Sequence, residues 1–446
     1  MPRRPILRTE LPGPVAASMI AQSESFVSSS YTRDYPLVAE SGEGCWIVDP
    51  DGNEFLDVTS GIAVCSTGHC HPDVVQAICE QARSLVHMSG TDFYYPVQAQ
   101  LAEALCARAP VKGDSPKVYF CNSGAEAVEA AMKLARWKTK RTNFIAFYNA
   151  FHGRTMGALS LTASKVRQKE GFGPFVPGVT HTIYPDPYRM GGDKAATQIA
   201  LDALHQRLAT TTPADEIAAI VVEPIQGEGG YLVPPHAFLQ ELRNICDEHG
   251  ILLVFDEVQS GMGRTGALWA SEHSGVKPDI IASAKGIASG MPLGAIFASA
   301  DVMSWPPGAH ASTFGGNPVS CAAALKTLEL LDDGLIDNAR EVGEHLMQEL
   351  ERTVGNHPNV GQIRGRGLMI GVELVKDRTS KARAYELRNR VVRDCFDRGL
   401  LILGCGKNTV RFAPALTINR EEATVAAELL AESLAACSEG SANTEV

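Results

Sequence analysis

The sequence predicts an α/β fold with one large, mostly parallel sheet and a second, smaller α+β domain. The first observation is the alternation of short apolar runs with amphipathic helical patterns along the middle of the chain, which is typical of strands joined by helices. The second is the run Ile217–Val222, which is apolar at every position, as expected for a strand covered on both faces. The third is that both ends of the chain carry hairpin patterns instead.

In the middle of the chain, apolar runs predict strands and amphipathic stretches predict helices. The predicted strands are Val118–Cys121, Asn143–Phe147, Ile217–Val222, Ile251–Phe255, Ile280–Ser283 and Ala295–Ala298. The predicted helices are Ala125–Trp137 and Ala237–His249. In the second helix Phe238, Leu242 and Ile245 recur on one side, and Gly250 stands where a glycine commonly ends a helix.

The two ends of the chain predict the smaller domain. Cys45–Val48 and Glu54–Val58 flank a Pro-Asp-Gly-Asn turn, which indicates a hairpin. Near the other end the expected elements are a strand at Gly367–Leu374, a helix at Ala384–Arg398, and a second hairpin of Leu400–Leu403 with Val410–Ala413. We expect residues 1–70 and 341–437 to form the smaller domain, residues 71–340 the large one, and residues 438–446 a disordered tail.

Composition and charge restrict the classes of function. Of the 446 residues, 45% are hydrophobic and 20% charged, so the chain can bury large cores and is not intrinsically disordered. The formal net charge of −11 disfavours nucleic-acid binding. No apolar run approaches the roughly 20 residues of a membrane span, and no apolar segment follows Arg3, Arg4 and Arg8, so we expect no secretory signal. Eleven cysteines without a C-x-x-C pair favour a reduced, cytoplasmic enzyme.

Candidate catalytic and ligand-binding residues lie at the carboxyl ends of predicted strands, where open α/β sheets bind ligands. Ser123 precedes a helix, so the amides of Gly124 and Ala125 either bind an anion or lie in a plain helix start that Ser123 caps. Asp256 ends one strand. Lys285 follows another, and is either a surface lysine or a desolvated nucleophile of the Schiff-base type.

Two further patterns stand in contexts that do not support their usual function. Gly261–Gly266 matches the G-x-G-x-x-G of dinucleotide-binding loops and is the sole basis for a nicotinamide oxidoreductase. Five residues separate it from the preceding strand, however, and Ala267–Ser274 is a poor helix. Gly68–Pro72 contains two histidines and a cysteine that are too close together to bind one tetrahedral ion, so we expect a turn and a helix start there and no metal site.

Taken together, the ordered motifs resemble those of class III pyridoxal-phosphate aminotransferases, from about Pro36 to Leu416. In chain order they are Gly61–Val64 with Gly68–Pro72, Asn122–Ala127, Phe151–Thr155, Glu223–Gly230, Asp256–Gln259, Ala284–Gly286 and Thr313–Asn317. Each motif is weak, but all of them in this order are specific. The resemblance implies pyridoxal 5′-phosphate as the cofactor and the aspartate-aminotransferase fold, fold type I.

The resemblance also implies roles in the cofactor pocket. Lys285 would form the Schiff base with the cofactor and, once released, move the proton between the substrate carbon and the cofactor. Asp256 would pair with the pyridine nitrogen, which makes the ring an electron sink. The other implied contacts are Gly124 and Ala125 on the phosphate, Phe151 on the ring face, Gln259 near the ring hydroxyl, Thr313 on the phosphate of the neighbouring subunit, and His152 and Val258 elsewhere in the pocket. The active unit would be a homodimer with shared active sites, alone or paired into a tetramer.

The substrate pocket is implied in the same way. Arg411 would bind the α-carboxylate, and Glu228 would mask that arginine when an ω-amino donor binds. Arg154 would hold the distal carboxylate of 4-aminobutyrate or 2-oxoglutarate, and Ile62 and Glu223 complete the set. The alternative for both arginines is structural pairing with nearby acids.

Within the family the resemblance is closest to 4-aminobutyrate aminotransferases, because the stretch Tyr184–Asp215 is similar to theirs. The expected reaction is transfer of the terminal amine of a 4-aminobutyrate-like donor to 2-oxoglutarate, ping-pong through pyridoxamine phosphate. Ile62 stands where ornithine aminotransferases carry tyrosine, whereas Gly61–Val64 also suits acetylornithine enzymes. Ser89–Tyr95 resembles a branch that includes amino-acid racemases. An acetylornithine or ornithine aminotransferase and a racemase or epimerase are the alternatives.

Overall fold

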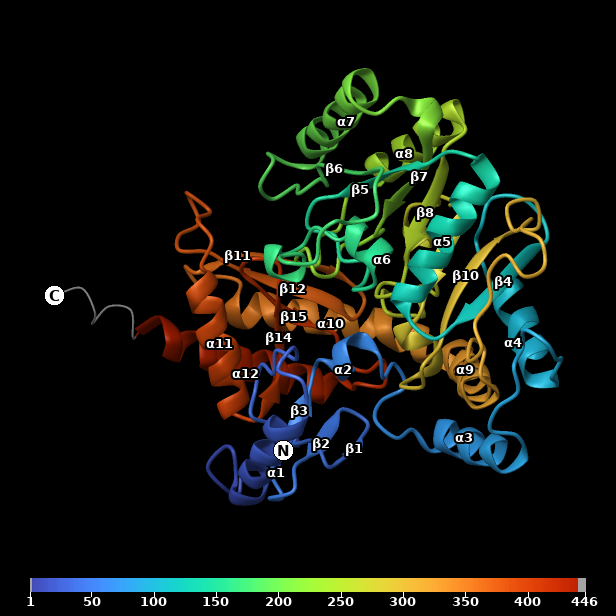
Figure 1. Ribbon diagram of the computed structural model, residues 1–446. Helices are drawn as coiled ribbons and strands as arrows, with labels where there is room; N and C mark the ends of the chain where they lie inside the picture. The colour runs from blue at the N-terminus through green and yellow to red at the C-terminus, as the bar shows by residue number, and fades with distance from the viewer. Residues whose placement is uncertain (1, 440–446) are drawn as a thin grey trace. The chain divides into compact units, whose positions relative to one another are not determined.

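The computed structural model describes residues 2–439, which fall into two compact units (Figure 1). Residues 72–336 form one of them, called the central unit here. Residues 2–71 and 337–439 form the other, called the terminal unit because both ends of the chain contribute to it. Among the described residues, none of the helices has the length and apolar character needed to cross a membrane.

The central unit is built on a seven-stranded sheet. In spatial order its strands are β4 (Pro116–Cys121), β10 (Gly294–Ser299), β9 (Ile280–Ser283), β8 (Leu252–Asp256), β7 (Ile217–Val222), β5 (Asn143–Phe147) and β6 (Val179–Thr182). Strands from β9 to β6 run parallel, and β10 is antiparallel to both its neighbours. The predicted mostly parallel sheet is confirmed, while β6 is a strand that the sequence analysis missed.

Two apolar cores cover the two faces of this sheet, because side chains along a strand alternate between faces. On β5, Phe144 and Ala146 pack in the same core as helix α5 (Gly124–Thr139). Ile145 and Phe147 pack in the other core, with α7 (Asp193–Thr210) and α8 (His236–His249). Every residue of β7 is buried, which explains its uninterrupted apolar run.

The rest of the central unit consists of helices and short helical turns. They are α3 (Pro72–Ser84), α4 (Pro96–Cys106), α6 (Met156–Leu161), α9 (Pro318–Leu330), η1 (Val166–Gln168), η2 (Ala214–Glu216), η3 (Ala270–His273), η4 (Lys285–Ala288) and η5 (Leu331–Leu335). Gly250 ends α8 in the left-handed conformation, as predicted. The G-x-G-x-x-G segment forms turns that lead into η3 instead of an α-helix, in agreement with its sequence context.

The terminal unit contains two four-stranded sheets. One is ordered β1 (Ser41–Glu43), β2 (Trp46–Val48), β3 (Glu54–Asp57), β13 (Leu400–Leu401), and the other β11 (Val360–Arg366), β12 (Met369–Leu374), β15 (Thr409–Phe412), β14 (Leu403–Cys405). Its helices are α1 (Pro14–Phe26), α2 (Ser60–Ala63), α10 (Ile336–Val354), α11 (Tyr385–Asp397) and α12 (Arg420–Glu439). The β2–β3 hairpin is antiparallel, as predicted.

The second predicted hairpin was wrong in its first strand. Leu400–Leu401 pairs in parallel with β3, and Leu403–Cys405 is the segment that pairs with β15. The chain changes sheets at Ile402, whose N–H donates to the hydroxyl of Tyr35 at 3.1 Å instead of to a strand. At the carboxyl end α12 extends through Ser438 and Glu439, so the predicted tail does not begin at residue 438, and its remaining residues 440–446 lie outside the described part of the chain.

Candidate active site

The predicted cofactor residues of the central unit follow the ends of neighbouring strands. Asp256 ends β8, Glu223 follows β7, Phe151 lies just past β5, and Lys285 opens η4 after β9. Gly124 opens α5 after β4, which runs in the same direction as β9 because both are antiparallel to β10. Since strands that run in one direction end at one edge, the fold collects these residues at the carboxyl edge of the sheet.

A buried acid–imidazole pair lies at this edge. His152 Nδ1 is 2.7 Å from Asp256 Oδ2, and Asp256 Oδ1 accepts the N–H of Val258 at 3.0 Å. Burial lowers the pKa of His152, but the carboxylates of Asp256 and Glu223 outweigh it and the net shift is upward. His152 and Asp256 therefore form a buried hydrogen-bonded pair, and an acid at this position is what a protonated pyridine nitrogen would pair with.

Buried polar atoms near this pair lack protein partners. Among residues 2–439, His152 Nε2 and Gln259 Oε1 are buried and have no hydrogen-bond partner. Buried polar groups are nearly always hydrogen-bonded, so an ordered water or a bound group would complete each of these two atoms. Both atoms belong to residues predicted to surround the cofactor.

Lys285 is held in an uncommon backbone conformation. It lies two residues beyond β9 with a φ of 46°, in the left-handed region that side chains with a Cβ rarely adopt. Such residues cost about 1–3 kcal/mol each and concentrate at functional sites. The side chain is half-buried, which fits a desolvated nucleophile better than a fully solvated surface lysine.

The start of α5 shows the predicted helix cap. Ser123 caps the helix, because its hydroxyl accepts the N–H of Glu126 at 3.2 Å. The amides of Gly124 and Ala125 lie in the first turn, where the helix offers them no internal partner, so they are available to an anion. A Cβ at Gly124 would stand 2.7 Å from Val258 Cγ1, so only glycine fits this approach.

Glu223 is tied to the backbone of the site. Its carboxylate accepts the N–H of Phe151 at 3.3 Å and that of Gly227 at 3.1 Å. Burial raises its pKa to about 7. These contacts make Glu223 an anchor for Phe151, whose side chain is half-buried and was predicted to stack on the cofactor ring.

Arg154 and Glu228 are the charged residues of the central unit that were predicted to contact substrate. The guanidinium carbon of Arg154, which is exposed, lies 5.6 Å from the centre of the Phe151 ring. Glu228 Oε2 lies 3.2 Å from Lys165 Nζ, a partner that no sequence pattern indicated. Thr313 is exposed on the segment before α9.

The two remaining predicted residues belong to the terminal unit. Arg411 is buried in the middle of β15, between Gly371 of β12 and Leu403 of β14. Ile62 is 45% exposed and lies in α2.

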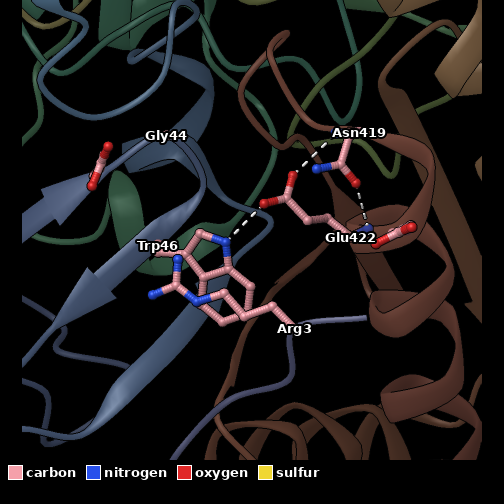
Figure 2. Close-up of a pocket in the computed structure, with 7 residues that line it drawn as sticks. Arg3, Gly44, Trp46, Asn419 and Glu422 are labelled. Atoms are coloured by element: carbon pink, nitrogen blue, oxygen red, sulfur yellow. Dashed lines mark hydrogen bonds between the residues drawn. The ribbon is translucent and has the colours of Figure 1, made fainter. Parts of the chain in front are cut away.

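An open pocket of about 350 Å³ in the terminal unit contains none of the predicted site residues. Figure 2 shows Trp46 Nε1 pointing at Glu422, to which it donates at 2.7 Å, and Arg3 lying over the indole ring. Asn419 and Glu422 exchange capping hydrogen bonds at the start of α12. These contacts tie β2 to α12 and give Arg3, Trp46, Asn419 and Glu422 packing and capping roles.

Comparison with known proteins identifies the family. The aminotransferase class-III model matches residues 27–434. The chain is 43% identical to acetylornithine aminotransferase of Methanopyrus kandleri, covering 93% of this chain and 98% of that protein. It is 39% identical to 4-aminobutyrate aminotransferase of Mycobacterium leprae, covering 96% of each, and 38% identical to alanine/serine racemase of Pyrococcus horikoshii, covering 94% and 90%.

Among solved structures, the omega transaminase from Pseudomonas jessenii in complex with PMP matches with a TM-score of 0.89 and 28% identity, covering 95% of this chain and 99% of that one. The residues at the carboxyl edge fit pyridoxal 5′-phosphate, with a lysine, a buried acid–imidazole pair, unpaired buried polar atoms and a helix start for a phosphate. The chain therefore belongs to the class-III aminotransferases and is a pyridoxal 5′-phosphate-dependent enzyme of fold type I.

Proposed function

We propose that this protein is an ω-aminotransferase that moves the terminal amine of a 4-aminobutyrate-like donor to 2-oxoglutarate by a ping-pong mechanism. The observation that carries the proposal is Glu228, a mostly buried acid on the same loop as Glu223 and within ion-pair distance of a lysine. An acid that can change its basic partner suits a pocket that must hide an arginine from one substrate and expose it to the next.

Each residue at the carboxyl edge of the sheet has its own role in the proposed reaction. Pyridoxal 5′-phosphate, when bound, supplies the electron sink. Lys285 would take the proton from the amine-bearing carbon of the donor and deliver it to the cofactor. Asp256, which contacts His152, would hold the positive charge on the ring nitrogen, and the amides of Gly124 and Ala125 at the start of α5 would bind the phosphate. Phe151, whose N–H donates to Glu223, would cover one face of the ring.

Carboxylate recognition is assigned to arginines. Arg154 binds the distal carboxylate and Arg411 the α-carboxylate of 2-oxoglutarate, with Glu228 covering Arg411 when the donor lacks a carboxylate there. This assignment is supported by the burial of Arg411, because an arginine held in the middle of a strand presents its fork in one orientation.

The second candidate is an acetylornithine aminotransferase, which the match to the Methanopyrus kandleri enzyme favours. N-acetylornithine also offers a terminal amine, so the same residues would serve and the donor pocket alone would differ. The two candidates therefore share the chemistry and differ in substrate.

A donor panel tests the proposal. The protein loaded with pyridoxal 5′-phosphate is mixed with 2-oxoglutarate and 4-aminobutyrate, N-acetylornithine or ornithine, and glutamate is measured. We expect the highest kcat/KM with 4-aminobutyrate. Preference for N-acetylornithine would establish the second candidate. Absence of glutamate with every ω-amine, together with inversion of alanine without an oxo acid, would make the protein a racemase.

We also propose a homodimer with shared active sites. Phe314, beside Thr313, has 60% of its surface exposed, and Phe93 and Tyr94 are exposed as well, which is unusual for large aromatic side chains. A second copy of the chain would cover them and bring Thr313 to its neighbour's phosphate. The described cysteines are all free thiols, which supports a reduced, cytoplasmic location.

A further inference from the structure

Residues Ser60–Ala63 form a left-handed turn, although three of the four carry a Cβ. Their φ angles are 43°, 65°, 69° and 58°, and the chain closes on itself through bonds from Ala63 N to Thr59 O at 2.8 Å and from Val64 N to Ser60 O at 2.9 Å. Left-handed conformation costs about 1–2 kcal/mol per residue with a Cβ, and successive residues rarely adopt it. For a β-branched residue such as Ile62 it is an outlier.

The carboxylate of Asp57 holds the entry to this turn. Oδ1 accepts from Thr59 N and Thr59 Oγ1 at 2.7 Å each, and from Ser60 N at 3.2 Å. Oδ2 lies 2.8 Å from His69 Nε2. His69 is itself fixed by its own backbone, which exchanges hydrogen bonds with Gly44 at 2.8 and 3.1 Å. The strained turn is therefore fixed on a buried, fully bonded acid.

The turn is also bonded to the chain that follows Arg411. The hydroxyl of Ser60 donates to Ala413 O at 2.7 Å, and Ala413 N donates to Val58 O at 2.8 Å. Ile62 and Arg411, which were predicted separately to contact substrate, thus lie on two segments that are joined by direct hydrogen bonds.

Backbone strain of this size persists only where surrounding interactions hold the strained conformation, and it is common at functional sites. We propose that Asp57 and His69 are positioning residues that hold the left-handed turn against the segment carrying Arg411, so that Ile62 forms a fixed wall of the substrate pocket. The proposal rests on the proposed function, because it takes Ile62 and Arg411 as substrate contacts. The new element is that Asp57 and His69, which do not contact substrate, determine how closely Ile62 packs against the amino donor.

The experiment compares His69→Ala with His69→Gln, whose side-chain amide can still donate to Asp57. We expect His69→Ala to raise KM at least about tenfold, the effect of losing one charge-assisted hydrogen bond, with kcat nearly unchanged. His69→Gln should restore KM. KM is measured with the amino compound that reacts fastest in the donor panel. If the enzyme does not use 4-aminobutyrate, the proposed function is wrong, but the effect of His69 on KM can still be measured.

Asp49→Ala is the matched control. Asp49 is as buried as Asp57, lies in the same unit and also holds a turn, by accepting from Asn53 N at 2.8 Å and Asp51 N at 3.0 Å. It should lower stability as much as His69→Ala does while leaving KM unchanged. If both variants change KM alike, the role of His69 is merely structural and the proposal is wrong.

Two further measurements test the proposal even if His69→Ala folds poorly. Ser60→Ala removes only the bond to Ala413 O and should give a smaller rise in KM in the same direction. Hydrogen exchange of the cofactor-free protein should show that the amides of Ala63 and Val64 lose protection in His69→Ala and keep it in His69→Gln. Unchanged protection and unchanged KM in Ser60→Ala and His69→Ala would overturn the proposal.

Discussion

Lys165 Nζ lies 3.2 Å from Glu228 Oε2, so the acid proposed to mask Arg411 has a second basic partner within its own unit. The lysine side chain is 46% exposed and the glutamate 15%, which makes this a partly screened ion pair worth up to about 1 kcal/mol. Lys165 would then compete with Arg411 for Glu228 and favour the state in which the arginine is available.

Lys165→Met should therefore raise KM for 2-oxoglutarate about two- to fivefold, the range expected from a partly exposed ion pair. KM for a donor without an α-carboxylate should stay the same or fall, because Glu228 is freer to cover Arg411. Steady-state kinetics with each substrate varied in turn measures both. Lys165→Arg keeps the charge and is the control, and a change of both KM values in one direction would contradict the competition.

Lys285→Ala should abolish transamination and remove the visible absorption band of the protein–cofactor complex. The reason is that Lys285 is the half-buried amine held beyond β9 in a strained conformation. Lys277→Ala, at an exposed position, should change neither property. Borohydride reduction followed by mass spectrometry should add the cofactor mass to the wild type and to Lys277→Ala only. Labelling of Lys285→Ala would mean that another lysine binds the cofactor.

Asp256→Asn should lower kcat about 10- to 100-fold, because it removes the charge that faces both His152 and the proposed ring nitrogen. The pKa of His152 should fall in the variant, since the Asp256 carboxylate is one of the groups that raise it. The measurements are kcat and the chemical shift of the His152 ring across a pH series. Asp215→Asn, at an exposed position, is the control. An unchanged kcat would remove Asp256 from the catalytic machinery.

The central sheet was largely predictable because its inner strands β7, β8, β9 and β10 are buried along their whole length and are apolar runs in the sequence. β5 and β7 match their predicted bounds, while β6, with a Thr-His-Thr pattern at the sheet edge, offered no such signal. β13 and β14 form one apolar stretch in sequence, and the change from one sheet to the other depends on pairing with β3 and β15 and on the hydrogen bond from Ile402 to Tyr35, all far away in the chain.

The site was predictable as residue types but not as contacts. The pairing of His152 with Asp256 joins residues 104 positions apart, and Lys165 reaches Glu228 over 63 positions. The left-handed turn at Ser60–Ala63 had no local signal, because isoleucine and alanine do not favour positive φ and the bonds that hold the turn come from Asp57 and Ala413.

The Asp57–His69 pair predicts a decline of stability at alkaline pH. Hydrogen bonds to Asp57 and Cys65 raise the pKa of His69 from 6.5 to about 10, against the opposing effect of burial. Below pH 6.5 the imidazole is charged in the folded and unfolded chains, and the contribution of the pair is fully present. Between pH 6.5 and about 10 only the unfolded chain releases the proton, so the free energy of unfolding falls by up to about 1.4 kcal/mol per pH unit.

Urea unfolding across that pH range measures this slope. His69→Gln does not titrate there, so its stability should change less with pH than that of the wild type. Parallel slopes for the two proteins would mean that the imidazole is not held in its charged form by Asp57.

Mixed dimers test whether Thr313 serves the neighbouring subunit. Lys285→Ala and Thr313→Asp should each be inactive, the second because a carboxylate replaces the hydroxyl that contacts a phosphate. When the two variants are dissociated, mixed and reassociated, half the dimers contain one subunit of each kind. If Thr313 acts across the interface, one site of each mixed dimer carries both substitutions and the other carries none. Activity should then return to about a quarter of the wild-type value.

The opposite arrangement gives a different result. If Thr313 served its own subunit, every site in the mixed dimer would carry one inactivating substitution, and mixing would restore nothing. Recovery therefore requires both a dimer and a shared site, and it does not depend on which amino donor the enzyme prefers. Thr313 and Phe314 are exposed on the single chain, where a neighbouring subunit has access to them, and this favours recovery.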